Sequence, residues 1–380
     1  MIFDTDAHVI ESEETFASLG KDPRWAHMAP RIIEGPVFPD GPTRAFWLIE
    51  SRVIPDVLGK STGGFGTPIK KGTLQYADYR VDSAELTSVQ ARIDDLDREG
   101  IDISVSFPTL FLENQVAANA GLLGAMVRAY NDWFAAKARG TLGRLRWVAP
   151  LPWPDINGAI DEMRRAKELG AAGVMMLGTA GDVLLDDPAL FPFYAEAERL
   201  RVPLCVHIGF SFPPLTAPYS SYQYSAARNA QRSYIAFYTP VHMAFCSFTV
   251  GGILDNFPRL RVGFLEAGIG WLPYWQELMD RGFAEQRITS RSANKRGDVR
   301  RITDYIKAGN IFVGTELDER GLGEFVEEFG DESLMYASDL PHAHRVLGAI
   351  DLFRGRRDVP EVAKEKILGP NGQRFFEEPL

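Results

Sequence analysis

The chain has 380 residues, 45% hydrophobic and 24% charged, so it can bury a large core and is not disordered. Its net charge of −10 argues against a nucleic-acid or anionic-membrane partner and favours a small-molecule partner. Two cysteines are too few for a disulfide framework, and we find neither a signal peptide nor an uninterrupted apolar stretch of transmembrane length, so we expect a cytoplasmic protein.

The first predicted strand, residues 3–9, is unusually polar. Because alternate side chains of a strand share a face, Asp4, Asp6 and His8 project to one side. A buried column of two carboxylates and an imidazole is costly unless a positive group lies among them. A divalent metal is the obvious candidate, and the alternative is that these groups hydrogen bond to one another or cap a loop.

Residues 12–79 form a long segment rich in proline, glycine and aromatic residues, with one hairpin-like stretch at 43–54. A segment of this size inside a compact protein is usually a lid or a binding excursion. We therefore expect a single domain over residues 1–380 with 12–79 inserted as a lid or loop region. The glycines at 63–66 lack the strand-to-helix setting of a phosphate-binding loop.

From residue 86 onward, helices and strands alternate. Further strands are predicted at 103–107, 146–151, 173–177, 202–208, 260–265, 311–313 and 334–337, and helices around 86–96, 116–138, 156–169, 189–200, 235–254, 271, 321–329 and 361. Eight such repeats predict an α/β fold, a closed (β/α)8 TIM barrel. A doubly wound open sheet is the alternative, but it would show a glycine turn after its first strand. In a barrel the carboxyl ends of the strands form the active-site face, so the excursion after the first strand would lie over the barrel mouth.

Three later strands are apolar until they end in an ionisable residue: His207, Glu266 and Asp339. In a barrel these side chains meet Asp6 and His8 at one rim. Each has a structural alternative, because such a histidine can be merely hydrogen-bonded, the glutamate can pair with an arginine, and the aspartate can cap a helix. Together, imidazoles and carboxylates suit Zn²⁺ or Mn²⁺. Such an ion can hold a substrate carboxylate or phenolate, or acidify a bound water, while a remaining carboxylate moves a proton.

Candidates for substrate binding surround this rim. His342 lies just past Asp339 and either contacts substrate or has a structural role. Trp47, Phe210 and Phe212 could wall a pocket for a flat aromatic acid, although aromatic residues equally build loops that pack on themselves.

Several segments together resemble the amidohydrolase superfamily, in the branch that includes aminocarboxymuconate-semialdehyde, resorcylate and carboxyvanillate decarboxylases. The segments that carry the resemblance are residues 4–11, 129–133, 206–209, 251–258, 266–273, 337–342 and 367–371. The resemblance implies that Asp6, His8, His207 and Asp339 bind one divalent ion, that Asp339 also carries a proton, and that the chain forms a homodimer or homotetramer. Two departures stand out: many relatives have histidine or glutamate where this chain has Asp6, and the characterised decarboxylases have a catalytic histidine where it has Glu266.

The leading hypothesis is a metal-dependent, non-oxidative decarboxylase of a small aromatic or unsaturated carboxylic acid. Asp339 would deliver a proton to the carbon that loses CO₂, and Glu266 would assist. The second hypothesis is a hydrolase of an amide, lactone or carbon–carbon bond that uses metal-activated water. A third is a binding or regulatory protein on an inactive barrel, which the exchange at Asp6 alone suggests.

Overall fold

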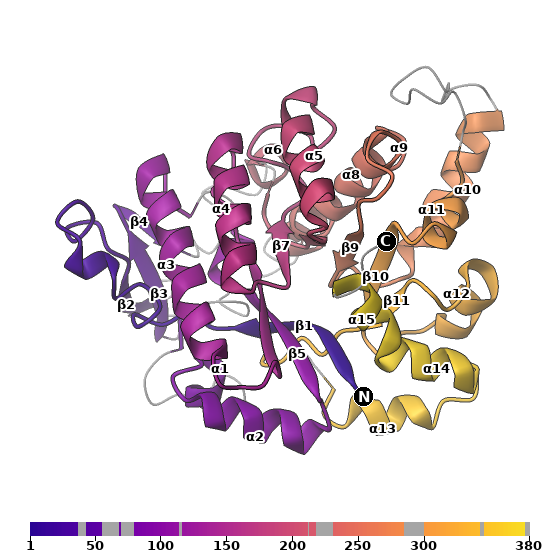
Figure 1. Cartoon of the computed structure of the whole chain (residues 1–380), viewed down its shortest axis with the longest axis horizontal. Coiled ribbons are helices and arrows are strands. Elements are labelled where there is room, and N and C mark those ends of the chain that lie inside the picture. Colours follow the sequence, from indigo (N-terminus) through magenta and orange to yellow (C-terminus); the bar gives the residue numbers. More distant parts are fainter. Residues whose placement is uncertain are drawn as a thin grey trace.

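The core of the structure, a computed structural model, is one sheet of eight parallel strands in the order β1-β5-β6-β7-β8-β9-β10-β11 (Figure 1). The structure describes residues 1–36, 43–54, 68–69, 80–113, 116–211, 213–217, 231–284, 300–342 and 346–376. The strands are β1 (Phe3–Val9), β5 (Ile103–Pro108), β6 (Leu145–Ala149), β7 (Gly173–Met176), β8 (Leu204–His207), β9 (Val262–Leu265), β10 (Ile311–Thr315) and β11 (Leu334–Tyr336). All eight predicted strands are present, and the predicted (β/α)8 barrel is confirmed.

The barrel closes between its first and last strands through residues that the sequence placed at the rim. The backbone N–H of Asp339 donates to the carbonyl of Asp6 at 2.8 Å, and that of His8 donates to the carbonyl of Leu340 at 2.6 Å. The hydroxyl of Thr5 adds a 2.8 Å hydrogen bond to the carbonyl of Tyr336. The candidate metal ligands therefore lie on the seam that holds the barrel together.

Helices cover the outside of the barrel between the strands. They are α1 (Val81–Ala84), α2 (Val89–Glu99), α3 (Ala120–Ala138), α4 (Ile156–Leu169), α5 (Phe191–Leu200), α6 (Pro213–Thr216), α8 (Thr239–Phe248), α9 (Ile253–Asn256), α10 (Trp271–Ala284), α11 (Ile302–Lys307), α12 (Leu322–Phe329), α13 (Ala349–Arg354), α14 (Glu361–Leu368) and α15 (Pro370–Phe376). Local sequence sets their ends: Ser88 caps the start of α2 by accepting a hydrogen bond from Ala91, and Gly100 ends it in the left-handed conformation, with φ of 72°.

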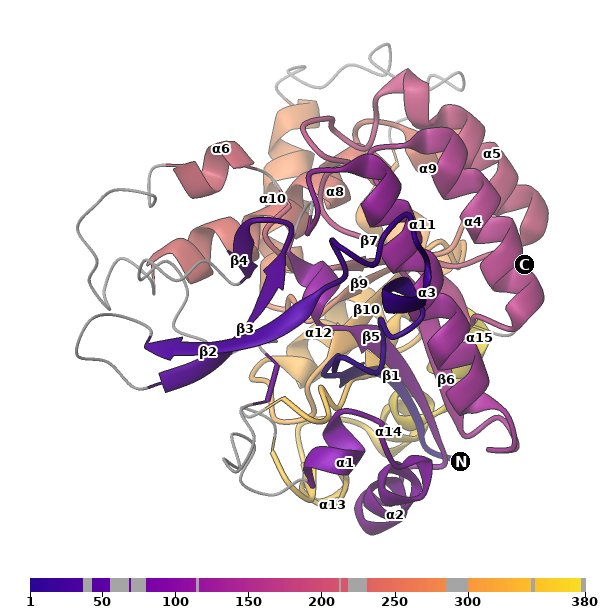
Figure 2. The same ribbon diagram turned by 90° about the vertical axis from the view of Figure 1, so that its left-hand side faces the viewer.

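The excursion after β1 contains a small antiparallel sheet of β2 (Arg31–Pro36), β3 (Thr43–Ile49) and β4 (Arg52–Ile54), which stands beside the barrel (Figure 2). The predicted hairpin at 43–54 is confirmed by β3 and β4, whereas β2 was missed because its glycine and proline suggest a turn. Glu50, just after β3, accepts hydrogen bonds from the N–H groups of Ala118 and Asn119 at 3.0 and 2.9 Å, before α3 begins. This part of the excursion is thus tied to the face where β5 ends, as expected. The glycines at 63–66 lie outside the described residues, and the lid role remains a prediction.

The predicted helix at 235–254 is divided into three parts. A π-helical turn (Ser233–Phe237) leads into α8, and a short break at Gly251 and Gly252 precedes α9. Gly252 has φ of 83°, a left-handed conformation that interrupts the helix at little cost only for glycine. In the sequence we found no uninterrupted apolar stretch of transmembrane length, but residues 234–256 are long enough to span a membrane and reach a mean hydropathy of 1.2. Inside the protein, 61% of the most apolar window of this segment is buried, as expected for a core helix.

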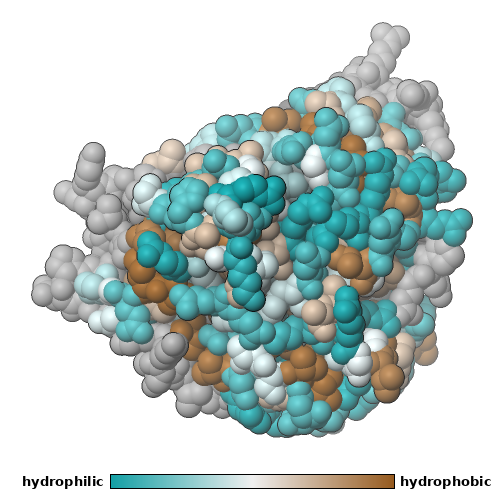
Figure 3. All heavy atoms as spheres, turned by 60° about the vertical axis from the view of Figure 1, so that its left-hand side comes forward, coloured by the Kyte–Doolittle hydropathy of each residue, from teal (hydrophilic) through white to brown (hydrophobic). Residues whose placement is uncertain are grey.

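Hydrophilic residues dominate the face shown in Figure 3.

Candidate metal centre

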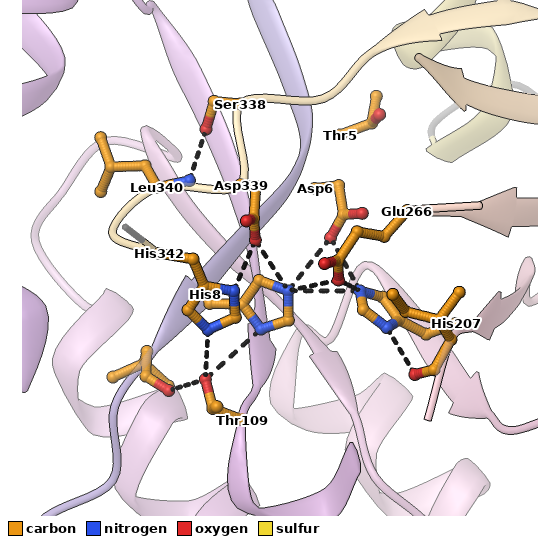
Figure 4. Close-up of polar contacts among 12 residues, drawn as sticks. Thr5, Asp6, His8, Thr109, His207, Glu266, Ser338, Asp339, Leu340 and His342 are labelled. Carbon is orange, nitrogen blue, oxygen red and sulfur yellow. Dashed lines mark hydrogen bonds and ion pairs between the residues drawn. The ribbon is translucent and has the colours of Figure 1, made fainter. Parts of the chain in front are cut away.

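Five predicted side chains converge at the carboxyl ends of β1, β8, β9 and β11 (Figure 4). Nε2 of His8 lies 3.2 Å from Nε2 of His207 and 3.5 Å from Oδ1 of Asp339. Oδ1 of Asp6 lies 3.4 Å from Nε2 of His207 and 3.6 Å from that of His8, so this short carboxylate reaches the cluster. Oε2 of Glu266 is also 3.4 Å from Nε2 of His207, which makes Glu266 a possible fifth ligand. The structure therefore brings together all the residues that we predicted for metal binding and proton transfer.

The backbone at two of these positions is strained. Glu266 and Asp339 both adopt the left-handed conformation, with φ of 55° and 53°, which is uncommon for residues other than glycine. Such conformations cost free energy and persist where the surrounding structure imposes them, often at functional sites. At Asp339 the hydrogen bond from its N–H to the carbonyl of Asp6 is part of that constraint. The chain turns sharply after β9 and β11, and the two carboxylates thereby reach the barrel axis.

The hydrogen bonds on the far side of each imidazole determine which nitrogen faces the cluster. Nδ1 of His207 lies 2.9 Å from the carbonyl of Ile208, which can only accept, so we assign the proton to Nδ1. Nδ1 of His8 lies 3.4 Å from the hydroxyl of Thr109, whose own proton is donated to the carbonyl of Val9. In the neutral form of each ring the unprotonated nitrogen is therefore Nε2, which faces the cluster, as in metal-binding histidines.

A divalent cation fits this donor set. Two unprotonated nitrogens only 3.2 Å apart repel each other, but nitrogens that each lie about 2.1 Å from a shared ion are about 3.0 to 3.4 Å apart. Both carboxylate oxygens of Asp6 are buried and accept no hydrogen bond within the described residues. A buried carboxylate of this kind calls for a cation. Asp6, His8 and His207 form one possible ligand group, and His8, Glu266, Asp339 and His342 form a second that shares His8.

The charges of the cluster are strongly coupled. Burial and the charges of Asp339, Asp6 and Glu316 raise the pKa of Glu266 well above its usual range. Burial likewise raises the pKa of Asp6, against the opposing influence of His207. Burial lowers the pKa of His207, but the charges of Asp6 and Asp339 and the hydrogen bonds of its ring together outweigh burial and leave that pKa raised. So many carboxylates in one buried site are an electrostatic cost that a bound cation would relieve.

Asp4 shares a strand face with Asp6 and His8 but has a different role. Its carboxylate accepts hydrogen bonds from the N–H and hydroxyl of Ser338 at 2.9 and 2.7 Å, and from the hydroxyl of Ser104 at 3.0 Å. Burial raises the pKa of Asp4 to about 6, in opposition to these hydrogen bonds. Of the alternatives to a metal role for the polar column, capping of a loop rather than mutual hydrogen bonding describes Asp4, which fixes Ser338, the residue that precedes Asp339.

The predicted substrate-binding residues lie in different surroundings. His342 is 1% exposed and contacts Asp339 and His8. Trp47 is fully buried and packs edge-on against Phe16, with ring centroids 5.5 Å apart. Phe210 lies directly after β8 and carries the guanidinium of Arg232 over its ring at 3.7 Å. Phe212 lies outside the described residues. Substrate contact by these four residues remains a prediction.

Two polar residues near the cluster were not predicted. Thr109 follows the proline that ends β5, where a threonine resembles an ordinary loop residue. Tyr238 lies between the π-helical turn and α8, within an apolar segment. Burial and the charges of Glu266, Glu316 and Asp339 raise its pKa to about 12, so its hydroxyl stays protonated and lies within electrostatic reach of the cluster. Its phenol is a hydrogen-bond donor that no motif in the sequence indicates.

The ends of the neighbouring strands β5, β6 and β7 are mainly apolar. A cavity of about 40 Å³ lies there, lined by Phe111, Glu113, Val116, Leu123, Pro150, Leu151, Trp153, Met175 and Leu177. This apolar wall contrasts with the charged cluster on the other strand ends.

Comparison with known proteins agrees with the fold. The family model for amidohydrolases matches residues 4–377. The 2-amino-3-carboxymuconate-6-semialdehyde decarboxylase of Dictyostelium discoideum is 25% identical over 291 residues, which is 75% of each chain. A gamma-resorcylate decarboxylase of Rhizobium sp. (strain MTP-10005) is 26% identical over 259 residues, 66% of this chain and 76% of the relative.

Solved structures show the same fold. An amidohydrolase from Mycobacterium avium subsp. paratuberculosis K-10 superimposes with a TM-score of 0.74 at 17% identity, covering 99% of this chain and 98% of the other. A dihydroxybenzoic acid decarboxylase from Polaromonas sp. JS666, solved with bound manganese, gives a TM-score of 0.61 at 18% identity over 99% and 96% of the two chains.

Proposed function

The chain belongs to the amidohydrolase family, and on that basis we propose that it is a metal-dependent, non-oxidative decarboxylase of a small aromatic or unsaturated carboxylic acid. The observation that carries the proposal is the convergence of the Nε2 atoms of His8 and His207 with the carboxylates of Asp6, Glu266 and Asp339. Both curated relatives described above are decarboxylases. Their names support a carboxylic acid as the substrate class.

Asp6, His8, His207 and Asp339 would hold one divalent ion, Zn²⁺ or Mn²⁺, and the bound manganese of the Polaromonas enzyme supports the second of these candidates. When bound, the ion supplies a Lewis acid for the substrate's carboxylate and a neighbouring oxygen. The mainly apolar ends of β5, β6 and β7 are suited to one face of a flat unsaturated ring.

Proton delivery belongs to the carboxyl groups of this chain. Loss of CO₂ leaves a carbon that must accept a proton, and Asp339 is held at the cluster by both its backbone and its side chain. Glu266 assists, since burial and the neighbouring carboxylates raise its pKa and thereby favour a carboxyl group that carries a proton.

One observation favours the alternative, a hydrolase. Glu266 is a carboxylate within 3.4 Å of Nε2 of His207, and an ionised carboxylate in that position could accept a proton from an attacking water. Both reactions use the same cluster. They differ in whether a carboxyl group in it gives up a proton or takes one.

The test is turnover of a panel of hydroxybenzoates, carboxyvanillate and unsaturated dicarboxylates by Mn²⁺- or Zn²⁺-loaded protein in H₂¹⁸O and, separately, in D₂O. A decarboxylase releases CO₂ and places deuterium on the carbon that loses it, with no ¹⁸O in the product. Incorporation of ¹⁸O without CO₂ would establish the hydrolase instead. Fully metal-loaded protein that converts no acid in the panel would contradict the decarboxylase proposal.

We also propose a cytoplasmic homodimer or homotetramer, as the resemblance implies. Analytical ultracentrifugation of the purified protein tests the oligomeric state, and a monomer at micromolar concentration would contradict it.

A further inference from the structure

His342 is enclosed by three residues of the site (Figure 4). Its ring stacks on that of His8, with centroids 4.1 Å apart and 25° between the planes. Its Nδ1 lies 2.7 Å from Oδ1 of Asp339, and its Nε2 lies 3.2 Å from the hydroxyl oxygen of Thr109. With one face and both nitrogens in contact with protein and only 1% of its surface exposed, His342 is poorly placed to contact substrate.

The hydroxyl of Thr109 sets the direction of these contacts. A hydroxyl has one proton, and Thr109 donates it to the carbonyl of Val9 at 2.8 Å. Its oxygen can then only accept, so the protons lie on Nε2 of His342 and on Nδ1 of His8. One hydroxyl thereby orients both rings: Nε2 of His8 faces the cluster, and Nδ1 of His342 faces Oδ1 of Asp339. At 2.7 Å two unprotonated acceptors would repel each other, so a proton must lie between these two atoms, on Nδ1 or on the carboxyl group.

Hydrogen bonds hold the main chain at Asp339 in place, so the orientation of its side chain depends on other contacts. The N–H of Asp339 is held by the carbonyl of Asp6, and the N–H of His342 donates to the carbonyl of Asp339 at 2.7 Å. This turn brings the imidazole back over the carboxylate that precedes it by three residues. The strained main chain at Asp339 therefore determines the position of its Cα and Cβ atoms, and the imidazole of His342 determines the direction of its carboxylate.

We propose that Thr109 and His342 form a positioning pair that orients the carboxylate of Asp339 against the metal-binding histidine His8. His342 is then a positioning residue that acts through Asp339. The inference rests on the proposed function for the role of Asp339 in the reaction, but the geometry of the pair can be tested without turnover.

The chain offers a matched control for Thr109. The hydroxyl of Thr5 is also buried and also donates to a backbone carbonyl at 2.8 Å, that of Tyr336. Thr5, however, lies on the face of β1 opposite to Asp6 and His8. Thr109→Val and Thr5→Val remove the same kind of hydrogen bond with the same change of shape. Only Thr109→Val removes the acceptor for the two imidazoles.

Two substitutions separate the nitrogens of His342. In His342→Asn the amide lies near the position of Nδ1 and keeps a polar partner for Asp339, whereas in His342→Gln it lies near the position of Nε2. Substitution of residues that orient metal ligands typically costs about 10- to 100-fold in activity or metal affinity. We expect kcat to fall about 10- to 100-fold in His342→Gln and about 3- to 10-fold in Thr109→Val. His342→Asn recovers most of the loss, and KM changes less than about twofold in all three because none of these groups contacts substrate.

The experiment compares wild type and these four variants by steady-state kinetics, by metal content, and by the visible absorption spectrum of Co²⁺-loaded protein. Shifted Co²⁺ bands in His342→Gln and Thr109→Val, with wild-type bands in Thr5→Val and His342→Asn, support the proposal even if no substrate is found. Equal behaviour of Thr109→Val and Thr5→Val overturns it, and so does a rise in KM with unchanged kcat in His342→Gln, which would make His342 a substrate contact. A wild-type protein that decarboxylates nothing refutes the proposed function, and the Co²⁺ spectra still decide the pairing of Thr109 with His342.

Discussion

The two halves of the barrel mouth are built differently. The ends of β1, β8, β9 and β11 carry buried acids and imidazoles, whereas the ends of β5, β6 and β7 form a mainly apolar wall around a cavity of about 40 Å³. The charged half lies on the seam where the barrel closes, and its backbone is strained at Glu266 and Asp339. The groups proposed for metal binding and proton transfer are concentrated where the fold is electrostatically most expensive, whereas the apolar half contributes packing and the proposed wall for the substrate. Substitutions in the two halves should therefore have opposite effects on activity and stability.

The largest effect on activity is expected for Asp339→Asn. The amide fills the same space but cannot deliver a proton, so we expect kcat to fall about 10²- to 10⁴-fold. Asp255→Asn is a matched control, because Asp255 is also buried but accepts its 3.2 Å hydrogen bond from Tyr305, on the helical layer outside the barrel. Near-normal turnover by Asp339→Asn would refute the proposed role of this carboxylate.

Metal binding should depend on the charged half alone. We expect about one Zn²⁺ or Mn²⁺ per chain in wild type and much less in His207→Ala, because one of two neighbouring imidazole ligands is lost. Activity lost on dialysis against a chelator should return with either ion in wild type only. Elemental analysis of protein purified without chelators measures the content. No metal in wild type supplied with both ions would favour the inactive-barrel hypothesis.

The apolar half should respond in stability. Met175 is 3% exposed and lines the cavity of this wall, so Met175→Ala should lower the free energy of unfolding by about 2 to 5 kcal/mol while metal content stays unchanged. Met163→Ala, in the fully buried face of α4, provides a reference loss away from the mouth. Urea denaturation measures both. Loss of metal from Met175→Ala would show that the two halves are not separable.

The sequence predicted the charged half well because of one local pattern. His207, Glu266 and Asp339 each end an otherwise apolar strand, and an ionisable residue in that position is conspicuous once the barrel topology is inferred. Thr109 and Tyr238 show no such contrast, since one follows a proline and the other lies in an apolar segment. Asp4 was placed on the same strand face as the predicted ligands Asp6 and His8, because a period of two specifies the face of a strand but not the depth. Only the structure shows that Ser338 and Ser104 occupy its carboxylate.

The same limit applies to backbone geometry. The segment 235–254 is mainly apolar, so its interruption at Gly252 depends on a left-handed φ that hydropathy does not reveal. The strand β2 ends in glycine and proline, which favour a turn, yet it pairs with β3 along all six of its residues. In both cases tertiary contacts override the local preference.

A smaller effect is expected on the pH dependence of stability. It concerns Glu11, a buried acid outside the cluster, whose charge a bound metal would not neutralise. Glu11 follows β1, is 1% exposed and accepts a 2.9 Å hydrogen bond from the N–H of Leu110. Burial raises its pKa to about 8 from an ordinary value of 4.5. Between these values the unfolded chain has released the proton that the folded chain keeps, so stability falls as the pH rises. We expect wild type to lose about 2 kcal/mol more than Glu11→Gln between pH 5.5 and 7.0, because glutamine does not ionise.

Glu162→Gln is the contrasting control, since Glu162 is also buried but is paired with Arg165 at 2.6 Å. Glu162→Gln should destabilise the protein to a similar extent at both pH values, because it removes the negative charge that pairs with Arg165 at either pH. Thermal or urea denaturation at the two pH values, with metal present in excess, provides the comparison. If Glu11→Gln and wild type keep the same difference in stability at both, then Glu11 is ionised in the folded protein, and the acids beyond the metal cluster carry no electrostatic cost of their own.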